Sequence, residues 1–216
     1  MSTQKLEAQC RRFLVSDVKN MDAAHDLAHI ERVVENAKLI LADEKADEEI
    51  TLAAAWLHDC VIIPKNDPYR RQASELAAKK ASSFLKEIGF DSDKIVRTAH
   101  AIHAHSFSAG IRPETPEAEI VQDADRLDAL GAVGIARCFT VGGKLERMMY
   151  EKVDPFCINR EPDDSTFTLD HFYAKLFKLP DMMNTKTGAY LARERVQYMK
   201  QFLERFGDEI QGKAEE

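Results

Sequence analysis

Residues 53–63, AAAWLHDCVII, place a histidine and an aspartate side by side, His58 and Asp59, in an otherwise apolar run. Burying an imidazole and a carboxylate together is unfavourable unless another group satisfies them. Residues 48–58 are rich in alanine and leucine, and the two prolines of the following VIIPKNDP prevent a helix from continuing. The stretch therefore predicts a buried helix that ends on the His-Asp pair.

The sequence on both sides of this helix is predicted to be helical almost throughout. Residues 26–43 repeat apolar side chains with the i, i+3, i+4, i+7 spacing of an amphipathic helix. Further helices are predicted over residues 69–88 (stopped by Gly89), 92–104, 116 to about 131 (with Thr115 as N-cap and Pro116 as first residue), 132–140, 169–179 and 185–206. The motif VGGK at 141–144 predicts a break, and residues 154–167 a flexible surface loop. Because strand-like alternation is nowhere sustained, the expected fold class is all-α in a single domain.

The composition is that of a globular protein with a sizeable core. The 216 residues are 44% hydrophobic and 31% charged, and the net charge of −7 argues against a general nucleic-acid binder, although a local cluster of cations could still bind a small phosphorylated ligand. Four cysteines lie far apart, at positions 10, 60, 138 and 157, which predicts free thiols in a reducing compartment. The polar start and the lack of a membrane-length apolar run predict a cytoplasmic protein without a membrane partner.

Two further polar motifs accompany the His-Asp pair. HDLAHIERV places His25 and His29 at i, i+4 on one helix face, and VQDADRLDALG, which contains Asp125, is an acidic cluster in another apolar stretch. Taken alone, His58-Asp59 is typical of a capping pair and His29 of a hydrogen-bonded core histidine. Their coincidence favours a shared metal site, because imidazole and carboxylate together suit Mn, Fe, Ni, Co or Zn, and less selectively Mg.

These residues resemble a known family. His29, His58-Asp59 and Asp125 match the H…HD…D pattern of the HD superfamily of metal-dependent phosphohydrolases. The segments HDLAHIERV, AAWLHDC, AHSFS, EAEIVQDADRLDALGAVGIAR and HFYAKLFKL, from about residue 25 to 200, resemble its small bacterial branch. The resemblance implies a single HD-domain helical bundle over residues 1–216, with a metal-binding core at about 25–135 and C-terminal helices at about 169–206 packed on it.

The resemblance also implies one divalent metal ion, with Mn or Ni favoured over Co, Fe, Mg or Zn. Its four expected ligands are His29, His58, Asp59 and Asp125. Asp125 is chosen because the superfamily's last aspartate follows an apolar residue and an alanine, a context that DADRL resembles. Asp123 and Asp128 are the alternative assignments, and either could instead orient the ligands or water.

Two residues are candidates for catalysis. Asp59 could bind the metal through one oxygen and accept a proton with the other. The resemblance in the HSFS segment points to His105 as a substrate-facing or proton-transfer residue. Alternatively, His100 and His103 could help to hold a second metal. For His25 three roles stay open: a hydrogen-bond partner of a metal ligand, a hydrogen-bond donor to the substrate phosphate, or a cap at the helix start.

Hydrolysis of a phosphate ester or anhydride also needs cations near the non-bridging oxygens. Six basic residues are candidates for binding substrate phosphates: Arg32, Lys65, Arg70, Arg71, Lys175 and Arg195. Arg32, one turn from His29, could instead fix a ligand carboxylate, and each of the other five could be a solvated surface charge. Lys65 has the strongest support, because it lies on the loop that leaves the His-Asp pair.

The function predicted from these features is a divalent-metal phosphohydrolase acting on nucleotides or similar small phosphorylated metabolites. Phosphoanhydride cleavage of nucleoside triphosphates is favoured, but a phosphomonoester or a cyclic phosphodiester meets the same chemical requirements. Two other classes stay open: a di-iron oxygenase of HD fold, which needs further histidine ligands, and a non-enzymatic nucleotide sensor. The acidic composition and modest size disfavour long nucleic acids as partners.

Overall fold

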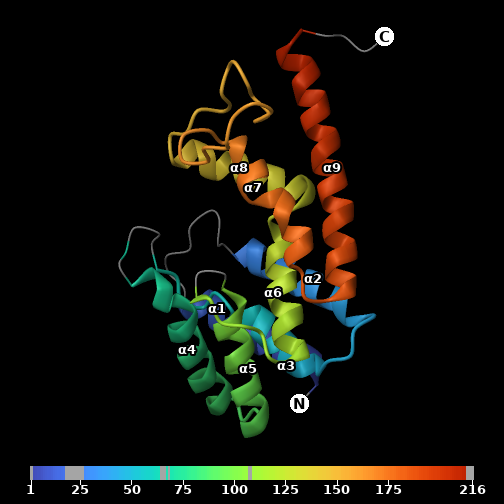
Figure 1. Cartoon of the computed structure of the whole chain (residues 1–216). Helices are drawn as coiled ribbons and strands as arrows, with labels where there is room; N and C mark the ends of the chain where they lie inside the picture. Colours follow the sequence, from blue (N-terminus) through green and yellow to red (C-terminus); the bar gives the residue numbers. More distant parts are fainter. Residues whose placement is uncertain (1, 18–26, 64–66, 68, 107–108, 213–216) are drawn as a thin grey trace. The chain divides into compact units, whose positions relative to one another are not determined.

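The structure is a computed structural model that describes residues 2–17, 27–63, 67, 69–106 and 109–212. Within these ranges it contains nine α-helices, two 3-10 helices and no strand beyond an isolated bridge between Met148 and Phe167 (Figure 1). The prediction of an all-α fold is therefore confirmed. The chain divides into two compact units, Met1–Asp125 and Arg126–Glu216.

The first unit is built around α3 (Glu48–Leu57), the helix that carries the His-Asp stretch. All residues from Ile50 to Leu57 are buried, as expected for a helix that is apolar on every side. The helices that pack against α3 are α1 (Thr3–Asp17), α2 (Leu27–Leu41), α4 (Ala73–Glu87) and α5 (Ser92–His105). The last helix of this unit is α6 (Pro116–Asp128), which continues into the second unit.

Local sequence determines where several of these helices begin and end. Asp47 caps α3 by accepting a hydrogen bond from the Ile50 N–H. Thr115 Oγ1 accepts one from the Ala118 N–H, which confirms the predicted N-cap of α6. Gly89, at φ +73°, follows α4 as predicted, since this backbone conformation favours glycine.

Helix α1 was not assigned from the sequence. Its buried apolar residues are Leu6, Cys10 and Leu14, one from each successive turn. This stripe is narrow and lies among charged and polar residues, so the helix depends on packing against α3 more than on a pronounced apolar face.

The second unit contains α7 (Gly131–Lys144), α8 (Asp170–Ala174), the 3-10 helix η3 (Leu176–Met182) and α9 (Lys186–Ile210). α9 packs against α7 and against η3. The rings of Phe139, Phe202 and Phe206 gather between α7 and α9, with centroids 6.0 to 6.5 Å apart. Aromatic packing of this kind contributes much of the buried area between two helices.

Two predicted boundaries in this unit are wrong. The glycines of VGGK lie inside α7, which continues to Lys144. A Cβ atom at Gly142 would clash with the side chain of Thr168, so this glycine permits close packing and does not end the helix. The predicted helix over 169–179 is interrupted at Lys175, where a φ of −136° separates α8 from η3.

The segment between α7 and α8 is irregular, as predicted for residues 154–167, and its own side chains hold its backbone. Arg160 forms a two-pronged ion pair with the buried Asp170, with one contact at 2.8 Å. Asp170 also accepts a hydrogen bond from the Asp163 N–H at 2.7 Å. These contacts tie the loop to the first residue of α8.

Two predictions about the chain as a whole can be compared with the structure. All four cysteines are free thiols, as predicted. None of the helices in the described ranges combines the length and the apolar character that a membrane span requires.

Candidate metal centre

His58 and Asp59 lie where α3 ends. The helix stops at Leu57 and His58 is its C-cap residue, so the chain leaves the helix directly after the histidine. The ring Nδ1 of His58 donates a hydrogen bond to the Ala55 carbonyl oxygen, 2.8 Å away. Because a carbonyl oxygen can only accept, the proton of the neutral ring lies on Nδ1, and Nε2 carries a lone pair.

The Nε2 atom of His58 is the clearest sign of a cation-binding site. It is buried and has no hydrogen-bond partner among the described residues. Its neighbour is Asp59 Oδ2, 3.6 Å away. An unprotonated ring nitrogen and a carboxylate oxygen are both acceptors, so only a donor or a cation placed between them satisfies both.

His29 and Asp125 reach the same point from α2 and α6. His29 is buried, and its Nε2 lies 3.5 Å from Asp125 Oδ1 and 3.9 Å from Asp59 Oδ2. The side chains of Asp59 and Asp125 are 22% and 32% exposed, so the cluster has a solvent-facing side. The four residues that the sequence predicted as ligands thus lie together.

His105 joins this cluster as the last residue of α5. Its Nδ1 donates to the Ile102 carbonyl oxygen at 2.6 Å, which repeats the i to i−3 pattern of His58. Its Nε2 lies 3.6 Å from Asp59 Oδ1. The two oxygens of Asp59 therefore face different neighbours, since Oδ2 faces His29 and His58 whereas Oδ1 faces His105.

The electrostatic environment distinguishes the two helix-end histidines. Burial lowers the pKa of His58 to about 4, so the ring is neutral at pH 7 and its lone pair is available. Burial also disfavours the charged ring of His105, but the nearby carboxylate of Asp59 outweighs that effect and raises its pKa. His105 consequently holds a proton more readily than His58 does.

The donors present fit a divalent metal ion. Two overlapping groups each offer ligand atoms within 4.8 Å of one another: His29, His58 and Asp125, and His58, Asp59 and His105. Three imidazoles and two carboxylates form a mixed nitrogen and oxygen set, which suits Mn, Fe, Co, Ni or Zn better than Mg or Ca. The neutral ring of His58 cannot balance the negative charge of the two carboxylates, whereas a divalent cation can.

The alternative ligands are placed differently. Among the described residues, neither donor group contains His100 or His103. His100 Nε2 instead accepts a hydrogen bond from the Glu114 N–H at 3.0 Å. Asp123 is buried but belongs to neither group, and Asp128 pairs with Arg137 within the second unit.

Three of the predicted phosphate-binding residues of the first unit are described, and they lie on two elements. Lys65 is outside the described residues, as is His25. Arg70 and Arg71 open the 3-10 helix η1 (Arg70–Gln72), where Arg70 donates to the Ile63 carbonyl oxygen and Arg71 is exposed. Arg32 is half-buried on α2, one turn beyond His29.

Lys175 and Arg195 both belong to the second unit. Lys175 is exposed between α8 and η3. Arg195 lies on α9 and donates to the Leu127 carbonyl oxygen at 2.6 Å. Burial lowers the pKa of its guanidinium, which stays charged at neutral pH.

Comparison with known proteins places the chain in a family. The HD domain family model matches residues 26–130. The uncharacterized protein YpgQ of Bacillus subtilis (strain 168) is 34% identical over 216 residues, which cover 98% of this chain and 97% of YpgQ. The chain therefore belongs to the HD superfamily, as the sequence predicted, and this membership indicates a metal-dependent phosphohydrolase.

Solved structures agree with this assignment. An HD-superfamily hydrolase from Bacillus thuringiensis has a TM-score of 0.77 at 34% identity, covering 97% of this chain and 99% of that one. The crystal structure of B. subtilis YpgQ in complex with ADP has a TM-score of 0.74 at 33% identity, covering 97% of each chain.

Proposed function

We propose that the protein hydrolyses a phosphoanhydride bond of a nucleoside triphosphate or of a similar small phosphorylated metabolite. The observation that carries this proposal is the buried Nε2 of His58, which has no hydrogen-bond partner in the described part of the chain and lies beside the carboxylate of Asp59. That arrangement is unfavourable without a cation, and a divalent cation beside a solvent-facing edge is what phosphate hydrolysis requires.

The metal ligands that we infer are His29, His58, Asp59 and Asp125. A bound divalent ion supplies Lewis-acid chemistry, since it activates water and polarises a phosphoryl oxygen. The protein orients the ligand atoms before the metal binds. In particular, the Ala55 carbonyl oxygen holds the proton of His58 on Nδ1, so its Nε2 lone pair needs no rearrangement before binding.

Asp59 and His105 are the residues that we assign to proton transfer. Asp59 directs Oδ2 toward His29 and His58, and its Oδ1 lies 3.6 Å from His105 Nε2. A proton shared between Asp59 Oδ1 and His105 Nε2 can be given to the oxygen of the leaving group, and a carboxylate at Oδ1 can accept one from the attacking water.

A nucleotide substrate is supported by a relative and by the available cations. YpgQ of B. subtilis has been crystallised in complex with ADP. In this chain the proposed phosphate-binding residues are Arg32, Lys65, Arg70, Arg71, Lys175 and Arg195. Arg71 is the most available of those in the described part, because it is exposed and forms no hydrogen bond or ion pair with another described residue.

The test is a screen of the purified protein against nucleoside triphosphates, phosphomonoesters and cyclic phosphodiesters with Mn, Ni, Co, Mg and Zn. Release of pyrophosphate or orthophosphate from a triphosphate is expected, and its identity shows which bond is cleaved. Turnover of phosphomonoesters or cyclic diesters alone would contradict the proposed substrate. Nucleotide binding without any phosphate product would indicate a sensor.

His58→Ala and Asp59→Ala are each expected to abolish both metal retention and hydrolysis, because each removes a proposed ligand. Asp93→Ala is the matched control, since Asp93 is an exposed aspartate in the first turn of α5. This control should retain metal and activity. Hydrolysis by metal-free His58→Ala would contradict the mechanism.

A further inference from the structure

A buried carboxamide on α2 contacts the backbone directly beside Asp125. Asn36 Nδ2 donates a hydrogen bond to the Ala124 carbonyl oxygen at 3.0 Å, and Asn36 is only 5% exposed. Asn36 follows His29 by two helical turns and lies on the same buried face of α2. The helix that carries His29 is thus joined to the backbone that carries Asp125.

A second buried carboxamide joins α6 to the end of α5. Gln122 Nε2 donates to the Ala104 carbonyl oxygen at 2.8 Å, and Gln122 is also 5% exposed. Ala104 directly precedes His105, and its carbonyl is one of those left without an intrahelical partner at a helix C-terminus. Gln122 lies one turn before Asp125 on α6.

We propose that Asn36 and Gln122 are positioning residues that fix the separation of His29, Asp125 and His105 by clamping α6 to α2 and α5. This inference rests on the proposed metal-dependent function. It goes beyond it because it assigns a role to two carboxamides that donate to backbone carbonyl oxygens, those of Ala124 and Ala104.

The packing of the first unit explains why such a clamp is needed. Helix α3 makes close backbone contacts with α2 and with α5, whereas α6 does not approach either of them as closely within the described residues. Apolar contacts at longer range tolerate sliding between helices. A directional hydrogen bond to a carbonyl oxygen does not, and a buried carbonyl or amide that loses its partner is strongly disfavoured. Each carboxamide therefore fixes one helix–helix register next to a cluster residue.

The test removes each donor with a side chain of similar size, in Asn36→Leu and Gln122→Met. Both variants should bind Co²⁺ about tenfold or more weakly and change its visible absorption spectrum, because the ligand separation changes. For a triphosphate substrate, kcat should fall about 10- to 100-fold with a smaller change in KM. Because both residues hold the same helix, the double variant should lose less than the product of the single effects.

Thr98→Val is the matched control. Thr98 is fully buried on α5, and its Oγ1 donates to the Lys94 carbonyl oxygen at 2.8 Å, two turns before His105. This variant loses a buried hydrogen bond without touching the clamp. It should melt at a lower temperature, yet keep the wild-type Co²⁺ spectrum, affinity and kcat.

Two further measurements keep the proposal falsifiable. The ring ¹⁵N chemical shifts of the histidines in metal-free protein should move in both clamp variants but not in Thr98→Val. If either variant does not fold, Asn36→Ser and Gln122→Asn replace it with the same expected results. The proposal would be overturned if Asn36→Leu and Gln122→Met had a lower Tm than the wild type but kept its ¹⁵N shifts, Co²⁺ spectrum and Co²⁺ affinity. A wild type that binds no Co²⁺ would instead contradict the proposed function, and the metal-free shifts would still decide on the clamp.

Discussion

Asp59 connects the two sides of the cluster, because its carboxylate oxygens face different histidines. Oδ2 lies 3.6 Å from His58 Nε2, and Oδ1 lies 3.6 Å from His105 Nε2. In the proposed mechanism one oxygen serves the metal and the other serves proton transfer. Removal of His58 and removal of His105 should therefore have different consequences.

His105→Ala should lower kcat about 10²- to 10⁴-fold at unchanged metal content, since proton transfer by a positioned side chain typically contributes a factor of that size. The measurements are steady-state turnover of a nucleoside triphosphate and metal content by mass spectrometry. Full turnover would remove His105 from the mechanism. Loss of the metal would make it a ligand.

At the scale of residues, the sequence predicted the group that the structure brings together. His29, His58, Asp59 and Asp125 stand out because polar groups in apolar stretches need a common explanation, and the family pattern supplies one. Asn36 and Gln122 were not predicted. An amide on an amphipathic helix is ordinary, and the carbonyl oxygens that they contact carry no mark in the sequence.

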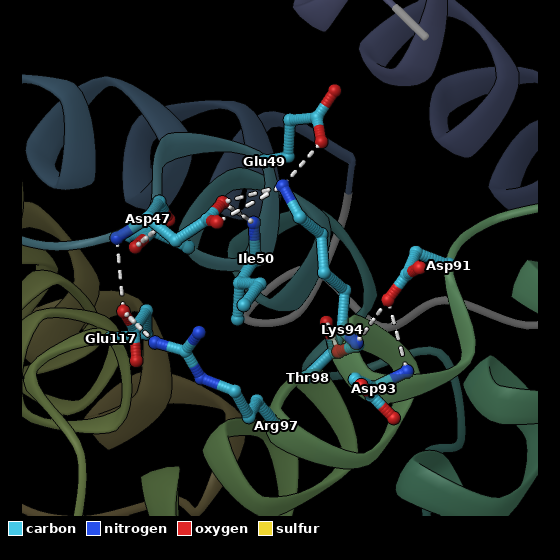
Figure 2. A network of polar contacts seen from close by, with 10 residues as sticks. Asp47, Glu49, Ile50, Asp91, Asp93, Lys94, Arg97, Thr98 and Glu117 are labelled. Carbon is cyan, nitrogen blue, oxygen red and sulfur yellow. Dashed lines mark hydrogen bonds and ion pairs between the residues drawn. The ribbon is translucent and has the colours of Figure 1, made fainter.

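At the scale of elements, charged side chains join three helices of the first unit. Figure 2 shows Glu117, in the first turn of α6, pointing toward Asp47 and Arg97; it accepts hydrogen bonds from the Asp47 N–H at 2.9 Å and from Arg97 at 2.6 Å. Lys94 reaches from α5 to Asp47 and Glu49 near the start of α3, at 3.0 and 2.6 Å. The network links the starts of α3 and α6 to the first turns of α5.

Folding changes the acidity of this network. Burial alone raises the pKa of Glu117, but hydrogen bonds from the N–H groups of Asp47 and of Glu117 itself, together with Arg97, outweigh it and lower the pKa. A carboxylate with a lowered pKa in the folded state stabilises the fold above its unfolded pKa, about 4.3 for glutamate. That stabilisation is lost as the pH falls through the folded value.

Glu117→Gln should therefore reduce the free energy of unfolding by about 1–3 kcal/mol at pH 7, the usual size for a hydrogen bond to a charged group. The difference from the wild type should shrink as the pH falls below about 4, because protonated glutamate and glutamine are then alike. Urea unfolding at several pH values measures both effects. A difference that stays constant down to pH 3 would contradict this account.

Glu75→Gln is the matched control for the pH experiment. Glu75 pairs with Lys79 one turn along α4, but both side chains are largely exposed. An exposed pair of this kind contributes little to stability. We expect its unfolding curves to follow those of the wild type at every pH.

Element boundaries were predictable where a side chain or a glycine acts locally. Thr115 begins α6 and Gly89 follows α4, because capping and positive φ are properties of a few adjacent residues. The break predicted at Gly142 was wrong for the opposite reason. Gly142 is required because Thr168, a residue distant in sequence, packs closely against it. The residues adjacent to Gly142 in the sequence therefore do not reveal its role.

At the scale of the whole molecule, metal binding should be coupled to stability. All five cluster residues belong to the unit that ends at Asp125: three lie on α2, α5 and α6, and His58 and Asp59 directly follow α3. A free metal concentration 100 times the Kd stabilises the folded state by about 2.7 kcal/mol, or roughly 5–10 °C in Tm for a chain of this size. Differential scanning calorimetry with Mn²⁺ and with a chelator measures this shift.

The specific variant decides whether such a shift reports the proposed site. In His58→Ala the metal-dependent rise in Tm should vanish, whereas in Asp93→Ala it should equal that of the wild type. An equal rise in His58→Ala would place the binding elsewhere on the molecule.

The sequence also predicted the helical class and the family of the whole chain, because helical periodicity and the dispersed motifs extend over most of its length. The division into a metal-binding core and C-terminal helices packed on it stays a prediction. So do the single metal ion and the cations of the second unit, Lys175 and Arg195. Packing between segments that are far apart in the sequence produces no periodic pattern of residues, so the sequence alone does not indicate it.

The way in which His58 and His105 are oriented has a consequence for protein engineering. Each ring receives its Nδ1 partner from its own helix, three residues earlier, so no additional side chain has to be designed to select the tautomer. A histidine at the last position of a helix, or directly after it, can thus be transferred to another protein without a separate residue to orient its ring. In a synthetic bundle that ends two helices in this manner, backbone carbonyls alone would hold both imidazole protons on Nδ1 and leave both Nε2 atoms free to bind.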